Sequence, residues 1–484
     1  MTSMFRFYNL INKNIVFLVL LFTLFTKLLI LLYNDGLEFE PDSYTHFLQI
    51  AAVFQDFPNN LPIGLTTWAK PMYVYPFGLL ANIFGLNNFL FIQILNIFIF
   101  IVISLLIYRS VLLIYESRYL ALVSLFLVNF SFILFKSSVS ALTEPIFALL
   151  LVLGFFYTVK RYYLMSGLVF GLAVLARIEG LLFLGLFIFW TLLELKICKY
   201  FNKVNLIKFL KIVLVSLIPV FVWNFFGFLD SGEVLYIFKG GYMDAAGVYG
   251  YGGWLDYPLR FPIYDGLIFI LFFFGLYLIF KSKVNICYKS HLILASLFVV
   301  IFLLSQILFW RLGIFGSAGL MRYMVSIIPF MIIVGISFWY YLLSTFAFNV
   351  IYKKTFFIVF IFLAQFFICF VNIFGFGPID SKWMPDRKEQ EVYKIAGNWI
   401  KENIAENEIS GICRYEVAYF ADISINSIKF VDLCRYNFLS KKPGYYYWNK
   451  NWEGVFGLTY EMIVESEAKV VKFFDENNIL FKLI

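Results

Sequence analysis

Long apolar runs separated by short polar segments occupy residues 1–377 of the chain. A run of roughly 20 apolar residues spans the hydrocarbon core of a bilayer as a helix, and shorter runs are tolerated inside a bundle. The pattern predicts an all-α polytopic membrane bundle of eleven helices, at 15–33, 88–107, 119–135, 142–158, 163–176, 180–195, 207–227, 265–280, 290–309, 321–343 and 355–376.

The charges between these runs indicate their orientation, because cations are enriched in cytoplasmic loops. With a cytoplasmic N-terminus, alternation places most loop cations inside, at Arg109, Arg118, Lys160, Arg161, Lys196, Lys199, Lys203, Lys281, Lys283, Lys289, Lys353 and Lys354. Most acids then lie in the opposite loops. We therefore expect a multi-pass protein of a prokaryotic cytoplasmic membrane with its C-terminus outside, and we expect the first span to be retained as an anchor.

Two segments depart from this pattern. Residues 71–86 are apolar but short and contain prolines, which favours a helix lying in or re-entering the outer face. After residue 377 charges of both signs are interspersed, which predicts a small extracytoplasmic α/β domain at 378–484. We expect helices at 387–404 and 467–478 and strands at 408–413, 427–432 and 479–484.

Composition agrees with a membrane protein. Hydrophobic residues make up 62% of the 484 residues and charged residues 14%, whereas soluble domains carry about 25% charged residues. A cytosolic enzyme, a disordered chain and a nucleic-acid-binding domain are thereby excluded. The net charge is +8, but residues 385–484 hold 13 basic and 15 acidic side chains, so the positive excess belongs to the membrane part.

Histidine and cysteine are scarce. The chain has two histidines and five cysteines, without a CxxC pair, so a histidine-built metal centre, a zinc ribbon and a redox motif are not expected. Cys413 and Cys434 either form a disulfide in the outer domain or remain free thiols.

The first predicted outer loop, at 34–87, is the richest in candidate chemistry. Glu40 and Asp42 flank Pro41, and Tyr44 and His46 follow. Pro41 suits the first turn of a helix, where the helix dipole favours a carboxylate, so Asp42 is either a helix-start residue or a catalytic group. Four residues apart on one helix face, Asp42 and His46 can share a proton, but two ligands alone do not make a metal site.

Two further segments bring charge to the same predicted face. Thr143 and Glu144 precede an apolar run, as an N-cap and first turn do, so Glu144 is either a charged helix start or part of a site. Arg322 enters the tenth span beside Tyr323. Its guanidinium suits a phosphate, and the alternative is an interfacial anchor.

After the first outer loop and the segments around Glu144 and Arg322, the fourth segment with candidate chemistry is the apolar stretch 166–184. Arg177 and Glu179 interrupt it at its predicted outer end. Gly167 and Gly171 would allow close helix approach. Snorkelling explains an arginine alone, but not the acid two residues later. Together with a glycine- and tyrosine-rich loop at 240–253, the four places predict one site at the outer face.

The order of these segments resembles that of the GT-C superfamily of membrane glycosyltransferases, which includes protein O-mannosyltransferases and the aminoarabinose transferase of lipid A. The similar segments are KPMYVYP (70–76), SALTEPIFALLLVLGFF (140–156), SGLVFGLAVLARIEGLLFL (166–184) and MRYMVSIIPF (321–330). The resemblance implies a GT-C fold and a sugar transfer from a polyprenyl or dolichyl phosphate carrier to an acceptor on the outer face, with inversion. The sugar could be a hexose such as mannose.

The resemblance also implies roles for residues. Asp42 is the expected general base, with Glu40 as second candidate, because a carboxylate can remove the acceptor hydroxyl proton. Arg322, Arg177 and Lys70 are expected at the donor phosphate, where a cation stabilises the departing charge. Other residues expected to bind substrate are His46, Tyr44, Glu144, Glu179 and Tyr323. No cofactor or metal is expected, and the partners are a lipid-linked sugar, a glycan, lipid or protein acceptor, and membrane lipids, without nucleic acid.

Two alternatives remain. DSYTH (42–46) is similar to the first-loop Asp-x-Tyr-Tyr-His of oligosaccharyltransferases, which implies a divalent metal and an asparagine acceptor, although the tail has no WWD segment. A secondary transporter would have charged or broken helices near the bilayer midplane, and Lys27 is the one charge deep in a predicted span.

Overall fold

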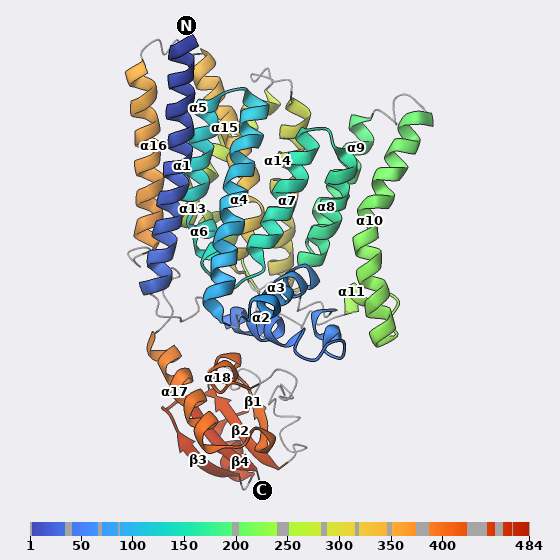
Figure 1. Ribbon diagram of the computed structural model, residues 1–484, viewed down its shortest axis with the longest axis vertical. Coiled ribbons are helices and arrows are strands. Elements are labelled where there is room, and N and C mark those ends of the chain that lie inside the picture. Colours follow the sequence, from blue (N-terminus) through green and yellow to red (C-terminus); the bar gives the residue numbers. More distant parts are fainter. Residues whose placement is uncertain are drawn as a thin grey trace.

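Helices pack side by side into a bundle, and a small sheet domain lies beyond one end of it (Figure 1). This computed structural model describes residues 2–33, 41–65, 70–85, 88–195, 203–239, 251–281, 288–314, 319–345, 351–373, 387–423, 443–450, 458–466 and 468–483. The bundle helices are α1 (Thr2–Tyr33), α4 (Phe89–Tyr115), α5 (Arg118–Asn129), α6 (Phe132–Ser138), α7 (Glu144–Val159), α8 (Tyr163–Ala176), α9 (Gly180–Glu194), α10 (Lys203–Ser231), α13 (Asp256–Phe280), α14 (Lys289–Leu312), α15 (Ile328–Thr345) and α16 (Ile351–Ile373).

Within the described segments, six helices are long and apolar enough to cross a membrane singly, namely α1, α4, α10, α13, α14 and α15. The pair α5 and α6 makes a seventh span if its 62° bend is counted as one crossing, and α7, α8 and α9 are shorter apolar helices. The chain is thus a multi-pass membrane protein, and the count of eleven spans stays a prediction.

The break between α5 and α6 is stabilised by a buried carboxylate from another helix. Asp265, at a non-helical point inside α13, accepts hydrogen bonds from the Ser131 hydroxyl at 2.9 Å and the Phe132 N–H at 3.0 Å. Gln365 of α16 donates to the same carboxylate at 3.1 Å. The carboxylate therefore satisfies N–H groups that the helix break leaves without an intrahelical acceptor.

The other end of α6 contacts a buried lysine side chain from α1. Lys27 of α1 is fully buried, and its ammonium donates to the Ser138 hydroxyl. The ammonium also lies 4.0 Å from the ring centroid of Phe100 and 3.9 Å from that of Phe135. Aromatic faces stabilise a cation that is removed from water.

Small residues allow α8 and α10 to touch, as the sequence predicts. A Cβ on Gly167 would lie 2.2 Å from the Ser216 hydroxyl, and a Cβ on Gly171 would lie 2.2 Å from the Ser216 carbonyl. Only glycine permits this approach of the two backbones.

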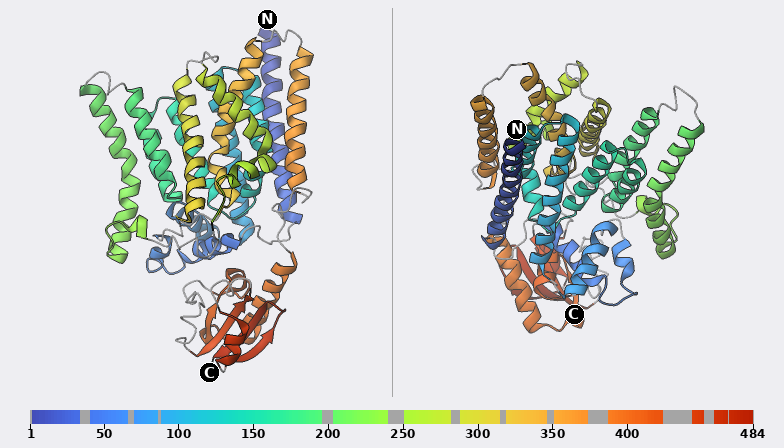
Figure 2. Two further views of the ribbon diagram at one scale, coloured as in Figure 1. Left: turned by 180° about the vertical axis from the view of Figure 1, so that it is seen from behind. Right: turned by 45° about the horizontal axis from the view of Figure 1, so that its top comes forward.

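Short helices close the end of the bundle that faces the sheet domain (Figure 2). They are α2 (Pro41–Ala52), η1 (Leu61–Leu65), α3 (Pro71–Phe84) and α11 (Tyr236–Lys239). The helix predicted at 71–86 is α3, which begins at Pro71 and is followed by its C-cap Gly85, a residue with a φ of 63°.

The sheet domain is α/β, as predicted. It contains α17 (Arg387–Asn403), η4 (Glu406–Glu408), β1 (Ile409–Ile412), α18 (Tyr415–Phe420), β2 (Gly444–Asn449), α21 (Tyr460–Glu465), β3 (Lys469–Phe473) and β4 (Asn478–Leu483). The strand order is β1-β2-β4-β3, with β1 parallel to β2 and the other pairs antiparallel. A parallel pair requires a crossover connection, and α18 lies within it.

The prediction of a helix at 467–478 is wrong, because residues 469–478 form β3, the turn that follows it and the first residue of β4. Along β3 exposed and half-buried residues alternate, which is the period of a strand. Asp475 turns the chain by accepting from the Asn477 N–H at 2.8 Å. The strand predicted at 427–432 and Cys434 lie outside the described residues, so the disulfide stays a prediction.

Candidate active site

Five charged side chains from four segments form a row of alternating charge at the end of the bundle nearest the sheet domain. In order they are Asp42, Arg322, Glu144, Arg177 and Glu179, and we call them the ion-pair chain. They come from α2, from η2 (Met321–Ser326), from the first residue of α7, and from the turn between α8 and α9. The structure thus brings together the four places that the sequence predicts.

The contacts within the ion-pair chain are short. One Glu144 oxygen, Oε1, lies 2.8 Å from Arg177 Nη1 and 3.5 Å from Arg322 Nε. Arg177 Nη2 lies 2.8 Å from Glu179 Oε1, and Arg322 Nη2 contacts Asp42 Oδ2 directly. Opposite charges in contact keep each other ionised after their removal from water.

The solvent exposure of the side chains differs along the ion-pair chain. The Glu144 side chain is 4% exposed, whereas the Asp42 side chain is 32% exposed. Burial would raise the pKa of Asp42, but the Arg322 guanidinium outweighs it and holds that pKa below its usual range. Asp42 is therefore an ionised carboxylate at the accessible end of the ion-pair chain.

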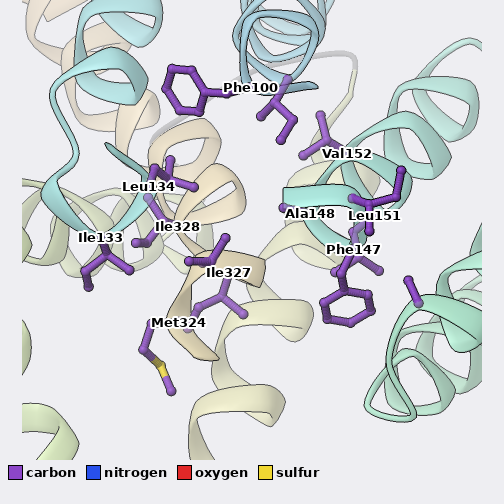
Figure 3. Packing of buried hydrophobic residues seen from close by; sticks show 14 of the residues in the cluster. Phe100, Ile133, Leu134, Phe147, Ala148, Leu151, Val152, Met324, Ile327 and Ile328 are labelled. Carbon is purple, nitrogen blue, oxygen red and sulfur yellow. The ribbon is translucent and has the colours of Figure 1, made fainter. Parts of the chain in front are cut away.

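Apolar packing fixes η2 beside α7. Figure 3 shows Met324 and Ile327, at the end of η2, between Ile133 of α6 and Phe147 of α7. All four side chains are buried. Such close packing leaves η2 little freedom, so Arg322 stays within reach of Glu144.

Glu144 lies at the first turn of α7, as predicted, but Thr143 does not cap this helix. Thr143 makes no side-chain hydrogen bond to the backbone of α7, and its hydroxyl lies 3.5 Å from Glu144 Oε2 instead. The helix dipole still favours an acid at this position.

Arg177 ends α8 in an extended conformation, and Glu179 precedes α9. The Arg177 guanidinium lies 5.0 Å from the Tyr323 ring centroid, and the Arg322 guanidinium lies 6.0 Å from it. Tyr323 thus contacts both arginines by cation–π geometry. Neither Arg177 nor Arg322 is a simple interfacial anchor, because both are mostly buried and paired with acids.

Lys70 lies near the ion-pair chain, directly before α3. It has a φ of 59° and is 9% exposed. Burial, reinforced by the Arg177 charge, lowers the pKa of Lys70 to about 8, while Glu179, Glu144 and Asp42 act in the opposite direction. The ammonium is therefore mostly protonated near neutral pH and easily deprotonated above it.

His46 lies on α2 one turn after Asp42 and is 5% exposed. Burial lowers its pKa to about 4, and the charges of Lys70 and Arg322 add to this effect, although Asp42 opposes it. The imidazole is thus neutral near pH 7. Its ring lies edge-on to Tyr73 of α3, with centroids 5.8 Å apart.

Tyr44 is not part of this cluster, although we expected it at the substrate. Its side chain is fully buried, and its ring meets Phe89, Tyr419 and Phe420. On a helix that begins at Pro41, Tyr44 faces away from Asp42. Glu40 and most of the 240–253 loop lie outside the described residues.

Sequence reasoning missed Asp265 and the aromatic contacts of Tyr44. Asp265 stands at the first position of the span predicted at 265–280, whereas α13 extends back to Asp256. The sequence signal that points to Asp265 is its charge next to an apolar run, because charged residues inside a membrane-spanning segment usually have a function or a charged or polar partner.

The described residues contain no group of three His, Cys, Asp or Glu side chains placed to hold a metal ion. Asp42 and His46 are close, but Glu144 and Glu179 are engaged by arginines. Among the described residues, which do not include Glu40, this donor set does not fit the divalent metal that the oligosaccharyltransferase resemblance implies.

Comparison with known proteins identifies the fold. No family model matches the sequence, and no curated protein sequence is significantly similar to it. ArnT from Cupriavidus metallidurans bound to undecaprenyl phosphate is similar in structure, with a TM-score of 0.62, 10% identity and coverage of 98% of both chains. The apo oligosaccharyltransferase of Archaeoglobus fulgidus has a TM-score of 0.58 and 11% identity, over 94% of this chain and 73% of that chain. The protein therefore has the GT-C fold, in an arrangement like that of ArnT.

Proposed function

We propose that the protein is a glycosyltransferase that moves a sugar from a polyprenyl phosphate carrier to an acceptor on the outer face of the membrane. One observation carries this proposal. Asp42 is the most exposed acid of the ion-pair chain, and it contacts a guanidinium that is itself mostly buried. A base and a phosphate-binding cation are thus adjacent at an accessible end of a GT-C fold.

In this mechanism Asp42 removes the proton of the acceptor hydroxyl. The hydroxyl oxygen attacks the anomeric carbon, the bond to the phosphate breaks, and a single displacement inverts the configuration there. Arg322 stabilises the negative charge that develops on the departing phosphate. Arg177 and Lys70 lie close enough to add their positive charges to this stabilisation. The mechanism uses no cofactor.

Donor binding also prepares the base. A donor phosphate at Arg322 competes with Asp42 for the guanidinium. Once Arg322 is engaged by the phosphate, the pKa of Asp42 rises, because burial is no longer opposed by a dedicated cation. The carboxylate then becomes a stronger base only when donor is present.

The fold relatives support the class of donor. ArnT was crystallised with undecaprenyl phosphate, and a polyprenyl phosphate has the chemistry that Arg322 and Lys70 fit. The acceptor is a glycan, a lipid or a protein. The oligosaccharyltransferase was crystallised with a tethered acceptor peptide, so a protein acceptor is included in the test.

The test is a deletion of the gene in the source organism, followed by mass spectrometry of its glycans, glycoproteins and lipid-linked sugars. We expect one glycosylated product to disappear and one polyprenyl-phosphate sugar to accumulate. The wild-type gene should restore the product and Asp42→Asn should not. Asp56→Asn, an exposed acid bonded to Asn59, is the matched control and should restore it. Full restoration by Asp42→Asn, or no change in any sugar on deletion, contradicts the proposal.

The phosphate assignment has its own test. Binding of undecaprenyl phosphate to the purified full-length protein should weaken at least tenfold in Arg322→Ala, since a hydrogen bond to a charged group is worth about 1.5–3 kcal/mol. Arg118→Ala, an exposed arginine at the start of α5, should bind as the wild type does. Equal affinity of Arg322→Ala and wild type contradicts the assignment.

A further inference from the structure

The sheet domain touches the helix that carries Asp42 through a cluster of aromatic rings. The cluster consists of Tyr44 and Phe47 of α2, Phe89 of α4, and Tyr419 and Phe420 of α18. We call it the docking cluster. Figures 1 and 2 show α2 between the bundle and the sheet domain, with α18 on the side of the domain that faces it.

The rings of the docking cluster are in direct contact. The Tyr419 centroid lies 5.5 Å from Tyr44, 5.2 Å from Phe47 and 4.7 Å from Phe89. Phe47 stacks on Phe89 at 4.4 Å, and Phe420 lies 6.2 Å from Tyr44. Edge-to-face rings at these distances attract one another beyond the burial of their surface.

The opposite face of α2 packs on α3. A Cβ on Gly78 of α3 would lie 2.5 Å from Val53 and 3.0 Å from the Ile50 carbonyl, so these two helices approach closely. A helix of 12 residues is marginal on its own. Its position is therefore set by α3 on one side and by α18 on the other.

The place of α18 is in turn set inside the sheet domain. A Cβ on Gly397 of α17 would lie 2.5 Å from the Phe420 Cβ and 2.8 Å from the Val417 carbonyl. Any larger residue at position 397 must push α18 away from α17. The sheet domain thus holds α18 rigidly against α2.

We propose that α18 is a positioning element for Asp42, with Tyr419 and Phe420 holding α2 where the carboxylate meets Arg322. This inference rests on the proposed function, in which Asp42 is the base. The arginines that would bind the donor phosphate belong to η2 and to the turn after α8, which the bundle holds without α18. Loss of the docking cluster should therefore impair the transfer step and spare donor binding.

The charged groups around Asp42 give a second readout. They are Arg322 from η2, Arg177 after α8, His46 on α2 and Lys70 before α3. If α2 shifts, Asp42 moves away from Arg322, and its burial then raises its pKa. The acidic limb of the pH profile of transfer should therefore move to higher pH.

The experiment compares Tyr419→Ala, Tyr419→Phe and Gly397→Ala in the full-length protein, with Asn398→Ala on the exposed side of α17 as control. Transfer is assayed in membranes supplied with the lipid extract of deletion cells, which contains the accumulated donor. Affinity is measured with undecaprenyl phosphate. We expect Tyr419→Ala to lose at least tenfold in transfer rate, while undecaprenyl phosphate binds at least as tightly as to the wild type, because an Asp42 displaced from Arg322 no longer competes with the phosphate. Gly397→Ala should lose transfer as well, although it touches neither α2 nor the ion-pair chain.

Each outcome decides the inference. Tyr419→Phe keeps the ring and should stay within twofold of wild type, as should Asn398→Ala. Wild-type transfer in both Tyr419→Ala and Gly397→Ala overturns the inference, and so does a parallel loss of transfer and affinity, which marks a general structural role. If Asp42→Asn is inactive in the same assay, these two outcomes contradict the inference about α18 but not the proposed function. If Asp42→Asn is active, the proposed function itself fails.

Discussion

Replacing Asp42 by asparagine should separate phosphate binding from catalysis, with opposite effects on the two. The Asp42 carboxylate contacts the Arg322 guanidinium, the group that we assign to the donor phosphate. A phosphate at this guanidinium must displace the carboxylate or lie beside it. Asparagine keeps the shape of the side chain and removes its charge, so undecaprenyl phosphate should bind more tightly while transfer is lost.

The size of this effect follows from the geometry. Two anions that share one guanidinium lie about 5 Å apart, where unit charges repel by about 3 kcal/mol at an effective dielectric constant of about 20. The Asp42 side chain is 32% exposed, so solvent screening lowers the repulsion to about 1.5 kcal/mol. We therefore expect the Kd for undecaprenyl phosphate to fall about tenfold in Asp42→Asn.

The assay is equilibrium binding of radiolabelled undecaprenyl phosphate to the purified protein in detergent, at pH 7 and low ionic strength. Asp56→Asn serves as control and should leave the Kd unchanged. The gain in Asp42→Asn should shrink as salt is added, because part of the repulsion acts through solvent. An equal or weaker affinity in Asp42→Asn would refute the competition between Asp42 and phosphate for Arg322.

Three further predictions concern groups near the site and in the bundle. Because burial lowers the pKa of Lys70 to about 8, undecaprenyl phosphate affinity should fall as pH rises through that value, and Lys70→Met should abolish this dependence in a binding titration. Lys27→Met should leave the melting temperature in detergent unchanged or raise it, since an apolar residue of similar volume replaces a buried charge. Lys27→Ala should lower the melting temperature, because the cavity that it leaves costs about 2 kcal/mol of stability. Gly171→Val should destabilise the protein by about 2 kcal/mol because its side chain meets the α10 backbone, while Gly185→Ala, with open space around it, should melt as wild type does.

Much of the bundle follows from the sequence because apolar length is a direct physical requirement of a membrane span. The alternation of inner and outer loops also predicts that Asp42, Glu144, Arg177 and Arg322 lie at one end of the bundle, since each stands in a predicted outer loop or at the outer end of a predicted span. The ion pairs between these residues cannot be predicted from the sequence around each residue. Arg322 meets Asp42 across 280 positions of sequence. Tertiary packing brings them together, because η2 packs between α6 and α7 while α2 packs between α3 and α18.

The errors have physical reasons as well. Residues 467–478 contain charges that favour a helix in isolation, but pairing with β4 determines their structure, because strand propensity depends on neighbours. Tyr44 follows Asp42 in a charged loop, and its burial depends on α18, more than 370 residues later in the chain. Thr143 occupies a capping position without capping, since its backbone is helical (φ −81°, ψ −18°), whereas a capping residue has non-helical dihedral angles.

The burial of Lys27 constrains the order in which the bundle assembles. During synthesis α1 enters the membrane before the residues that surround its ammonium, namely Phe100 of α4 and Phe135 and Ser138 of α6. A lysine at the centre of an inserted helix costs about 3 kcal/mol until it finds partners. The first helix to be made therefore carries this cost until α4 and α6 have joined it, so the Lys27 side chain couples the settling of α1 in the bilayer to the folding of two helices that are made later.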